Sequence, residues 1–79
     1  MSKLLIVDDE IEICEFLKSF FEDRDFGVAV ANGGSQALEK VATFHPEVVL
    51  LDIQMPGMDG LQVLKKIKEI YPKVKVIMV

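Results

Sequence analysis

The chain has 79 residues, of which 51% are hydrophobic and 28% charged, with a formal net charge of −4. This composition is typical of one small soluble domain, and no apolar run approaches the ~20 residues of a membrane-spanning helix. The acidic balance argues against a nucleic-acid surface, because contact with phosphates needs clustered Lys and Arg. The single cysteine, Cys14, cannot form an internal disulfide and indicates a reducing compartment. The first apolar run meets three acids without a cleavage site, so we expect a cytoplasmic protein without a secretory signal.

The first part of the chain predicts a strand, a helix and a second strand. The segment "KLLIV" (3–7) is continuous, branched and apolar, which is typical of a central parallel strand covered on both faces. Apolar residues at helical spacing then predict one stripe that packs into the core: Ile13, Phe16, Leu17, Phe20 and Phe21. Cys14 is expected to be a small core residue rather than a reactive thiol. "GVAVA" (27–31) begins with alternation and fits a strand nearer an edge.

The second part of the chain continues this alternation. A helix is predicted over 35–44, ended by His45 and Pro46, with three inward residues: Ala37, Leu38 and Val41. "EVVLL" (47–51) is a second candidate for a central strand. A third helix starts near Gly60, with Asp59 as its cap, and is expected to bury Leu61, Leu64 and Ile67. "VKVIMV" (74–79) predicts a last strand near an edge.

The order of these elements predicts the fold class. Four strands alternate with three helices, which indicates an α/β protein with a parallel sheet and right-handed crossovers. No repeat, low-complexity tract or linker divides residues 1–79, so we expect one domain.

Carboxylates follow two of the predicted central strands. Asp8, Asp9 and Glu10 come after the first strand, and Asp52 comes after the third. In an open parallel sheet, ligands bind beyond the carboxyl ends of the strands. Two carboxylates ~4 Å apart repel by on the order of 4 kcal/mol at an effective dielectric near 20, so an ionised cluster needs a cation. Hard oxygen ligands in a cleft favour Mg²⁺.

Each of these residues also has a simpler interpretation. Asp8 and Asp9 could be caps of the first helix, since acids are favoured at helix starts. Asp52 could be a turn residue at the end of a strand. His45 is expected to be a solvated loop residue without a functional role.

Two segments together resemble a known family. "LLIVDDE" and "VVLLDIQMPGMDG" are similar to the receiver domain of two-component response regulators, and the resemblance covers the whole chain. It implies a flavodoxin-like sheet with strand order 2-1-3-4-5. It also implies that Asp52 is the phosphoacceptor, which takes a phosphoryl group from a histidine kinase or a small phosphodonor to form an aspartyl phosphate. The implied Mg²⁺ ligands are Asp9, Asp8 directly or through water, Asp52 and the backbone carbonyl of Gln54.

The residues behind Asp52 fit this chemistry. A carboxylate is a weak nucleophile, and position together with a metal supplies most of what phosphoryl transfer requires. Pro56 and Gly57 are expected to let the chain turn sharply, and Gly60 gives the backbone room where the next helix begins.

Other classes of protein fail on particular residues. A haloacid-dehalogenase-like phosphatase would have a second aspartate two positions after Asp52, where this chain has Gln54. "ANGGSQALEK" (31–40) lacks the lysine of a P-loop and the spacing of a dinucleotide fingerprint. A flavodoxin-type FMN site would have hydroxyl residues after the first strand, where this chain has acids.

The length of the chain raises an alternative. The family has five strand–helix units, and these 79 residues end in the fourth strand, so we expect a partial receiver domain without the fourth and fifth helices and the fifth strand. The Ser or Thr and the Lys that the family uses after the last two strands are not among these residues, and we expect no enzyme in the ordinary sense. The alternative is a truncated or engineered fragment that does not signal and forms a homo-oligomer through exposed core strands.

Overall fold

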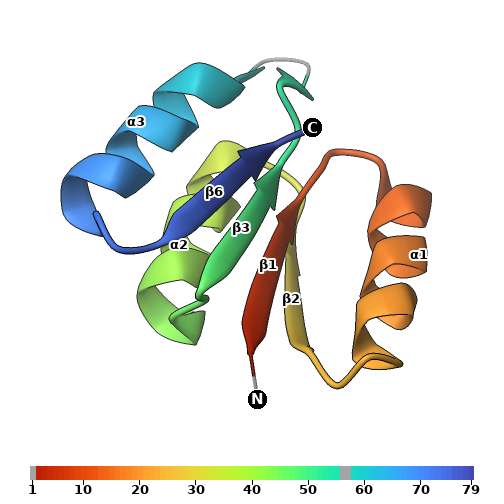
Figure 1. Cartoon of the computed structure of the whole chain (residues 1–79). Coiled ribbons are helices and arrows are strands. Elements are labelled where there is room, and N and C mark those ends of the chain that lie inside the picture. Colours follow the sequence, from red (N-terminus) through yellow and green to blue (C-terminus); the bar gives the residue numbers. More distant parts are fainter. Residues whose placement is uncertain (1, 56–57) are drawn as a thin grey trace.

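The computed structural model describes residues 2–55 and 58–79 and shows one parallel sheet with helices on both of its faces (Figure 1). Pro56 and Gly57, which we expected to shape the loop behind Asp52, lie outside the described residues. The elements in chain order are β1 (Lys3–Val7), α1 (Ile11–Glu22), β2 (Gly27–Ala31), α2 (Gly34–Phe44), β3 (Val48–Leu51), β4 (Gln54–Met55), β5 (Met58–Asp59), α3 (Gly60–Ile70) and β6 (Lys75–Met78).

The main sheet has the strand order β2-β1-β3-β6, and all its strands are parallel. The predicted α/β fold of flavodoxin-like receiver type is therefore confirmed, with β1 and β3 in the centre. The sequence did not predict the short antiparallel pair of β4 and β5, which follows β3 and leads into α3.

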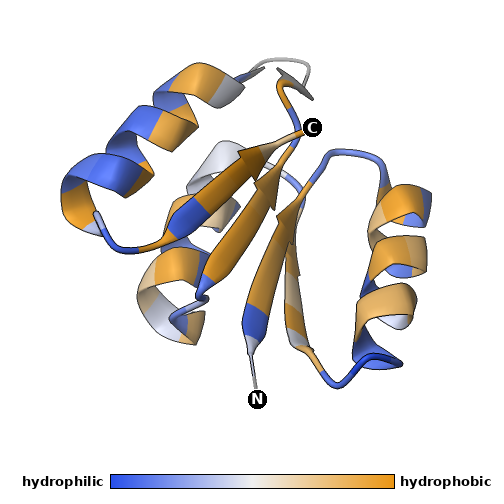
Figure 2. Ribbon diagram, viewed as in Figure 1, coloured by the Kyte–Doolittle hydropathy of each residue, from blue (hydrophilic) through white to orange (hydrophobic). Residues whose placement is uncertain are grey.

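Alternate residues of the central strands face two different layers of helices. Leu5 and Val7 of β1 face α2 and α3, where they join a buried cluster that includes Val49, Leu51 and Ile67. Leu4 and Ile6 face the opposite side and pack with Cys14 of α1. Figure 2 shows that the central strands are almost continuously hydrophobic, as expected for a sheet covered on both faces.

Helix α1 is rotated relative to the predicted stripe. The residues of α1 that pack against the sheet are Cys14, Leu17 and Phe21. Cys14 is buried, and the other two are partly buried. Phe16 is 69% exposed, and Ile13 and Phe20 are also exposed, so the prediction that these three pack into the core was wrong. The small side chain of Cys14 lets the helix approach the sheet closely. Cys14, Leu17 and Phe21 have the helical spacing i, i+3, i+7, so they form an apolar stripe as regular as the stripe that we predicted.

The other two helices follow the prediction more closely. In α2, Ala37 and Val41 are buried, and the helix ends at His45, whose φ of 54° is left-handed. In α3, Asp59 caps the helix, because its side chain accepts the N–H of Leu61 at 2.9 Å. The expected burial of Leu61 was wrong: this residue in the first turn is 59% exposed, and the unpredicted Val63 is buried together with Ile67. No helix within 2–55 and 58–79 is long and apolar enough to cross a membrane.

Candidate functional site

The sheet brings the ends of β1 and β3 side by side. Val7 and Leu51 are partners in the parallel register, so Asp8 and Asp52 each stand one residue past the paired strands. The backbone ladder continues to these residues: the N–H of Asp52 donates to the carbonyl of Val7 at 2.9 Å, and the N–H of Asp8 donates to Ala31 at 3.1 Å. The backbones that carry the two carboxylates are therefore fixed by the sheet.

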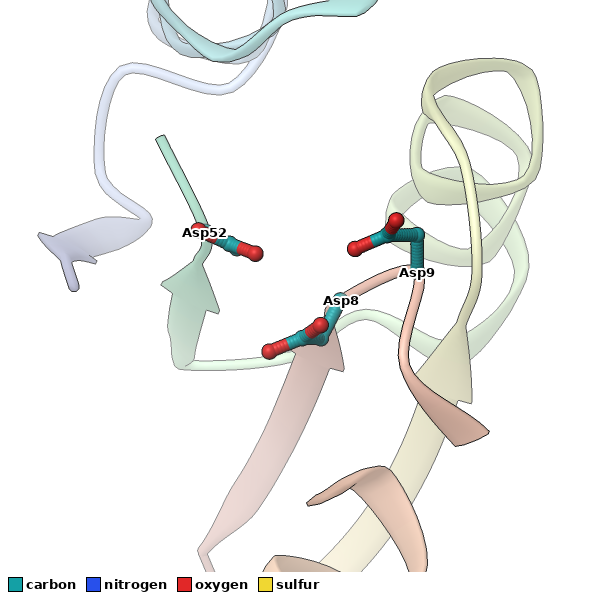
Figure 3. A group of neighbouring side chains, drawn as sticks. All are labelled: Asp8, Asp9 and Asp52. Atoms are coloured by element: carbon teal, nitrogen blue, oxygen red, sulfur yellow. The ribbon is translucent and has the colours of Figure 1, made fainter. Parts of the chain in front are cut away.

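The carboxylates of Asp8, Asp9 and Asp52 converge at this edge (Figure 3). One oxygen from each lies within 4.8 Å of the others; Asp8 and Asp52 are half-buried, and Asp9 is exposed. Opposite vertices of an octahedral Mg²⁺ sphere are ~4 Å apart, and the ion prefers oxygen ligands and keeps several waters. The three carboxylates therefore fit a Mg²⁺ ion, with one of them acting through water or after a small movement.

The environment of Asp8 shows the electrostatic cost of the cluster. Partial burial raises the pKa of the Asp8 carboxyl, and the charges of Asp52 and Asp9 raise it further. A hydrogen bond from the N–H of Glu10 to Asp8 Oδ1, 2.9 Å long, acts in the opposite direction. A cation at this position would relieve the repulsion that these three carboxylates impose on one another.

The backbone of Asp8 has two further partners, which the sequence did not predict. The side-chain amide of Asn32 donates to the Asp8 carbonyl oxygen at 2.9 Å, and the Cys14 thiol donates to the same oxygen at 3.3 Å. Burial raises the pKa of the Cys14 thiol, and the nearby charge of Asp8 adds to this effect. Because this pKa is raised, Cys14 stays protonated and acts as a hydrogen-bond donor, in agreement with its predicted place in the core.

The simpler interpretation of Asp8 and Asp9 as helix caps has little support. The N-cap residue of α1 is Glu10, whose side chain makes no capping hydrogen bond. Asp8 and Asp9 precede it, and the carboxylate of Asp8 binds the N–H of the cap residue rather than an N–H inside the helix. Their carboxylates gather with Asp52 instead of with the helix end.

Two further predicted residues lie next to Asp52. Gln54 is in β4, two residues beyond Asp52, and pairs with Asp59 of β5 in antiparallel register. The role of its carbonyl as a metal ligand stays a prediction. Gly60 begins α3 directly against the backbone of Asp52 and Ile53, as expected for a residue that gives this backbone room.

The fold and this edge define a class: a flavodoxin-like parallel sheet with an acidic cluster at the ends of its central strands. The family model of the response regulator receiver domain matches residues 4–79. The chain belongs to this family, and it is a receiver domain of the kind found in two-component response regulators.

Curated relatives agree with this membership. The chain is 46% identical over 79 residues to the chemotaxis protein CheY of Listeria monocytogenes, covering 99% of this chain and 66% of the relative. It is 44% identical over 70 residues to the transcriptional regulatory protein CpxR homolog of Haemophilus influenzae, covering 89% of this chain but only 30% of the relative. The chain thus spans less than two thirds of the length of these relatives.

Solved structures show the same fold. The chemotaxis protein CheY4 of Vibrio cholerae superposes with a TM-score of 0.94 at 30% identity, over 99% of this chain and 67% of that protein. The response regulator TrrA of Thermotoga maritima, solved in complex with Mg²⁺-BeF, superposes with a TM-score of 0.91 at 36% identity, over 99% of this chain and 68% of that protein.

Proposed function

We propose that this chain is a phosphoacceptor receiver domain that takes a phosphoryl group on Asp52 in the presence of Mg²⁺, with a sensor histidine kinase as the donor. The observation that carries the proposal is the convergence of the carboxylates of Asp8, Asp9 and Asp52 at the ends of two central strands. The Mg²⁺-BeF complex of TrrA supports it from a related protein. Family membership supports a kinase partner in general.

The reaction is a displacement at phosphorus. An oxygen of the Asp52 carboxylate forms a bond to phosphorus while the bond from phosphorus to the donor nitrogen breaks, and the electron pair of that bond leaves with the donor imidazole. The product is an acyl phosphate on Asp52. A bound Mg²⁺ neutralises negative charge on the phosphoryl oxygens.

The residues of this chain contribute position and charge. The hydrogen bond between the N–H of Asp52 and Val7 fixes the backbone of the nucleophile at the end of β3. Asp8 and Asp9 would hold the metal from the neighbouring strand, with the carbonyl of Gln54 as a further ligand. Reactions of this type depend mainly on positioning and electrostatics. The proposed mechanism therefore needs no residue of this chain as a general acid or base.

Phosphorylation of the purified chain tests the proposal. Incubation with a small phosphodonor such as phosphoramidate and Mg²⁺ should add one phosphoryl group, seen in the intact mass and removed by hydroxylamine, which cleaves acyl phosphates. Asp52→Asn should abolish the added mass, and removal of Mg²⁺ with a chelator should also abolish it. The matched control is Asp23→Asn, an exposed carboxylate after α1, which should be phosphorylated like the original chain. Phosphorylation of Asp52→Asn at the original rate would refute the proposal.

We also propose self-association through the edge of the sheet, because β6 combines an open edge with exposed apolar residues. In the described part of the chain β6 is an outer strand, and Ile77 in it and Val79 directly after it are 53% and 75% exposed. The N–H of Lys75 donates to the carbonyl of Glu47, directly before β3, and the N–H of Val79 donates to Leu51 of β3. The N–H and C=O groups of Val76 and Met78 therefore point to the open edge. An apolar edge strand of this kind favours pairing with a second copy.

Size-exclusion chromatography with light scattering tests this second proposal. The original chain should elute as an oligomer whose mass depends on concentration, and Ile77→Lys should shift it toward the monomer. Leu61→Lys is the matched control, since Leu61 is similarly exposed but belongs to helix α3 and not to the edge strand. A monomer at all concentrations would exclude self-association and leave the receiver function unaffected.

A further inference from the structure

Two side chains from different elements hold the peptide group between Asp8 and Asp9. Asn32, in the connection between β2 and α2, donates from Nδ2 to the Asp8 carbonyl oxygen at 2.9 Å. Cys14, in α1, donates from Sγ to the same oxygen at 3.3 Å. Asn32 Nδ2 also lies 3.5 Å from Cys14 Sγ, so the three groups form a closed triangle.

The connection that carries Asn32 is itself fixed. The backbone N–H of Asn32 donates to Oε1 of Gln36, in the first turn of α2, at 3.1 Å. The preceding residue, Ala31, is buried and accepts the N–H of Asp8 at 3.1 Å. The donor that reaches the Asp8 carbonyl is therefore anchored on both sides.

The orientation of this peptide decides where the two carboxylates point. A peptide group is planar, so a fixed carbonyl also fixes the N–H of Asp9 and the direction in which the chain leaves Asp8. The peptide group before Asp8 is fixed by the bond to Ala31, and the Asp8 carboxylate is bound by the N–H of Glu10. The triangle with Asn32 and Cys14 completes the restraint on this turn.

We propose that Asn32 is a positioning residue for the metal site: together with the Cys14 thiol, its side-chain amide fixes the Asp8–Asp9 peptide so that both carboxylates face Asp52. This inference rests on the function proposed above. Without the amide, like-charge repulsion spreads the carboxylates, and a cation must restore their arrangement when it binds. Partners outside the ligand set commonly change metal affinity by about tenfold or more.

Calorimetric titration with Mg²⁺ alone tests the inference on the folded chain. The variant Asn32→Ala should raise the Kd for Mg²⁺ about tenfold. Asn32→Ser keeps a hydrogen-bond donor at this residue, so it should recover part of this loss. The matched control is Thr43→Val, which loses a side-chain hydrogen bond to a backbone carbonyl, that of Glu39 at 3.0 Å, away from the site. Its Kd should not change.

A spectroscopic readout separates positioning from general stability. In metal-free solution, the ¹³C shift of the Asp8 carbonyl should move in Asn32→Ala and return partly in Asn32→Ser. If Asn32→Ala does not fold, Cys14→Ser and Cys14→Ala give the same comparison, because serine keeps a donor to the same carbonyl. Mg²⁺ binding that is equal in the donor-keeping and donor-lacking variants would overturn this inference alone. An original chain that binds no Mg²⁺ would overturn the proposed function and this inference with it.

Discussion

A Cβ atom placed on Gly60 would lie 2.9 Å from the carbonyl oxygen of Asp52. The same atom would lie 3.1 and 3.2 Å from two backbone atoms of Ile53. The backbone of the first turn of α3 thus packs directly against the backbone of the two residues that follow β3. Any side chain at residue 60 would push on the residue that we propose as the phosphoacceptor.

The variant Gly60→Ala should therefore destabilise the protein and disturb Asp52. Overpacking against backbone that cannot move away costs ~1–3 kcal/mol of unfolding free energy, which urea unfolding measures. Phosphorylation of the folded variant should also be slower. Gly33→Ala is the control, since nothing lies within 4 Å of a Cβ atom there, and it should change stability by no more than ~0.5 kcal/mol. Equal effects of the two variants would contradict the close packing at Gly60.

The raised pKa of Asp8 predicts how stability depends on pH without metal. Its unfolded-state value is 3.8 and its folded-state value is higher, so the folded protein binds more protons between the two values. The free energy of unfolding should therefore fall as pH rises through this window. The variant Asp8→Asn should flatten this dependence and raise stability at neutral pH by up to ~1 kcal/mol, the scale of partly exposed charge pairs.

Urea unfolding in Mg²⁺-free buffer over a range of pH values measures this effect. Asp23→Asn is the control, because Asp23 is an exposed carboxylate after α1 and does not belong to the cluster. Added Mg²⁺ should stabilise the original chain more than Asp8→Asn, since a ligand stabilises the state that binds it. Lower stability of Asp8→Asn at neutral pH without Mg²⁺ would show that repulsion does not dominate at Asp8.

The central strands could be predicted from the sequence because a continuous apolar run is typical of a strand that is buried on both faces. The segments 3–7 and 27–31 match β1 and β2, and the central places of β1 and β3 follow from their continuous apolar runs. The site followed from the same pattern. Once β1 and β3 are parallel neighbours, the residues after them must meet at one edge.

The rotation of α1 could not be predicted from hydrophobicity alone. Phe16 and Phe20 are apolar, but the row that packs on the sheet contains Cys14, whose small volume suits close approach. The exposed ring of Phe20 contacts a cation instead of the core: the guanidinium of Arg24 lies 3.6 Å from the centre of this ring. Such a cation–π contact stabilises an exposed ring that helical periodicity assigns to the core.

The contact of Asn32 with Asp8 was also beyond sequence reasoning. The two residues are 24 positions apart, and an asparagine before two glycines is typical of an ordinary turn. Only the pairing of β1 with β2, which places Ala31 beside Val7, brings Asn32 to the carbonyl of Asp8. A side-chain hydrogen bond of this kind depends on the strand register, and a continuous apolar run such as β1 lacks the alternation that would indicate its register.

The left-handed backbone of His45 predicts a stabilising substitution. His45 follows α2 with φ of 54° and ψ of 57°, a conformation that costs a residue with a Cβ atom ~1–2 kcal/mol. His45→Gly removes this cost but gains freedom in the unfolded chain, so the net gain should be ~0.5–1 kcal/mol. His45→Val should have the opposite sign, since a β-branched residue tolerates this region poorly. Thermal unfolding of the two variants measures both effects, and the same sign for both would contradict this description of the helix end.

The burial of Cys14 predicts slow alkylation in the folded protein. Burial and the charge of Asp8 raise the pKa of the thiol, and alkylating reagents react with the thiolate. The packing of α1 against the sheet also limits the access of the reagent to the thiol. Iodoacetamide should therefore modify Cys14 at least ~100-fold more slowly in the native protein than in urea. The native rate should still rise with pH above the ordinary thiol value of 9.0.

The variant Asp8→Asn sharpens this alkylation experiment. It removes a charge that raises the pKa of the Cys14 thiol, so native alkylation near pH 9 should become faster while the rate in urea stays the same. Intact mass measured over time gives both rates. Equal native rates in the original chain and in Asp8→Asn would mean that Asp8 does not act on the thiol electrostatically. Equal rates in native buffer and in urea would mean that Cys14 is accessible, and that its hydrogen bond to the Asp8 carbonyl does not persist in solution.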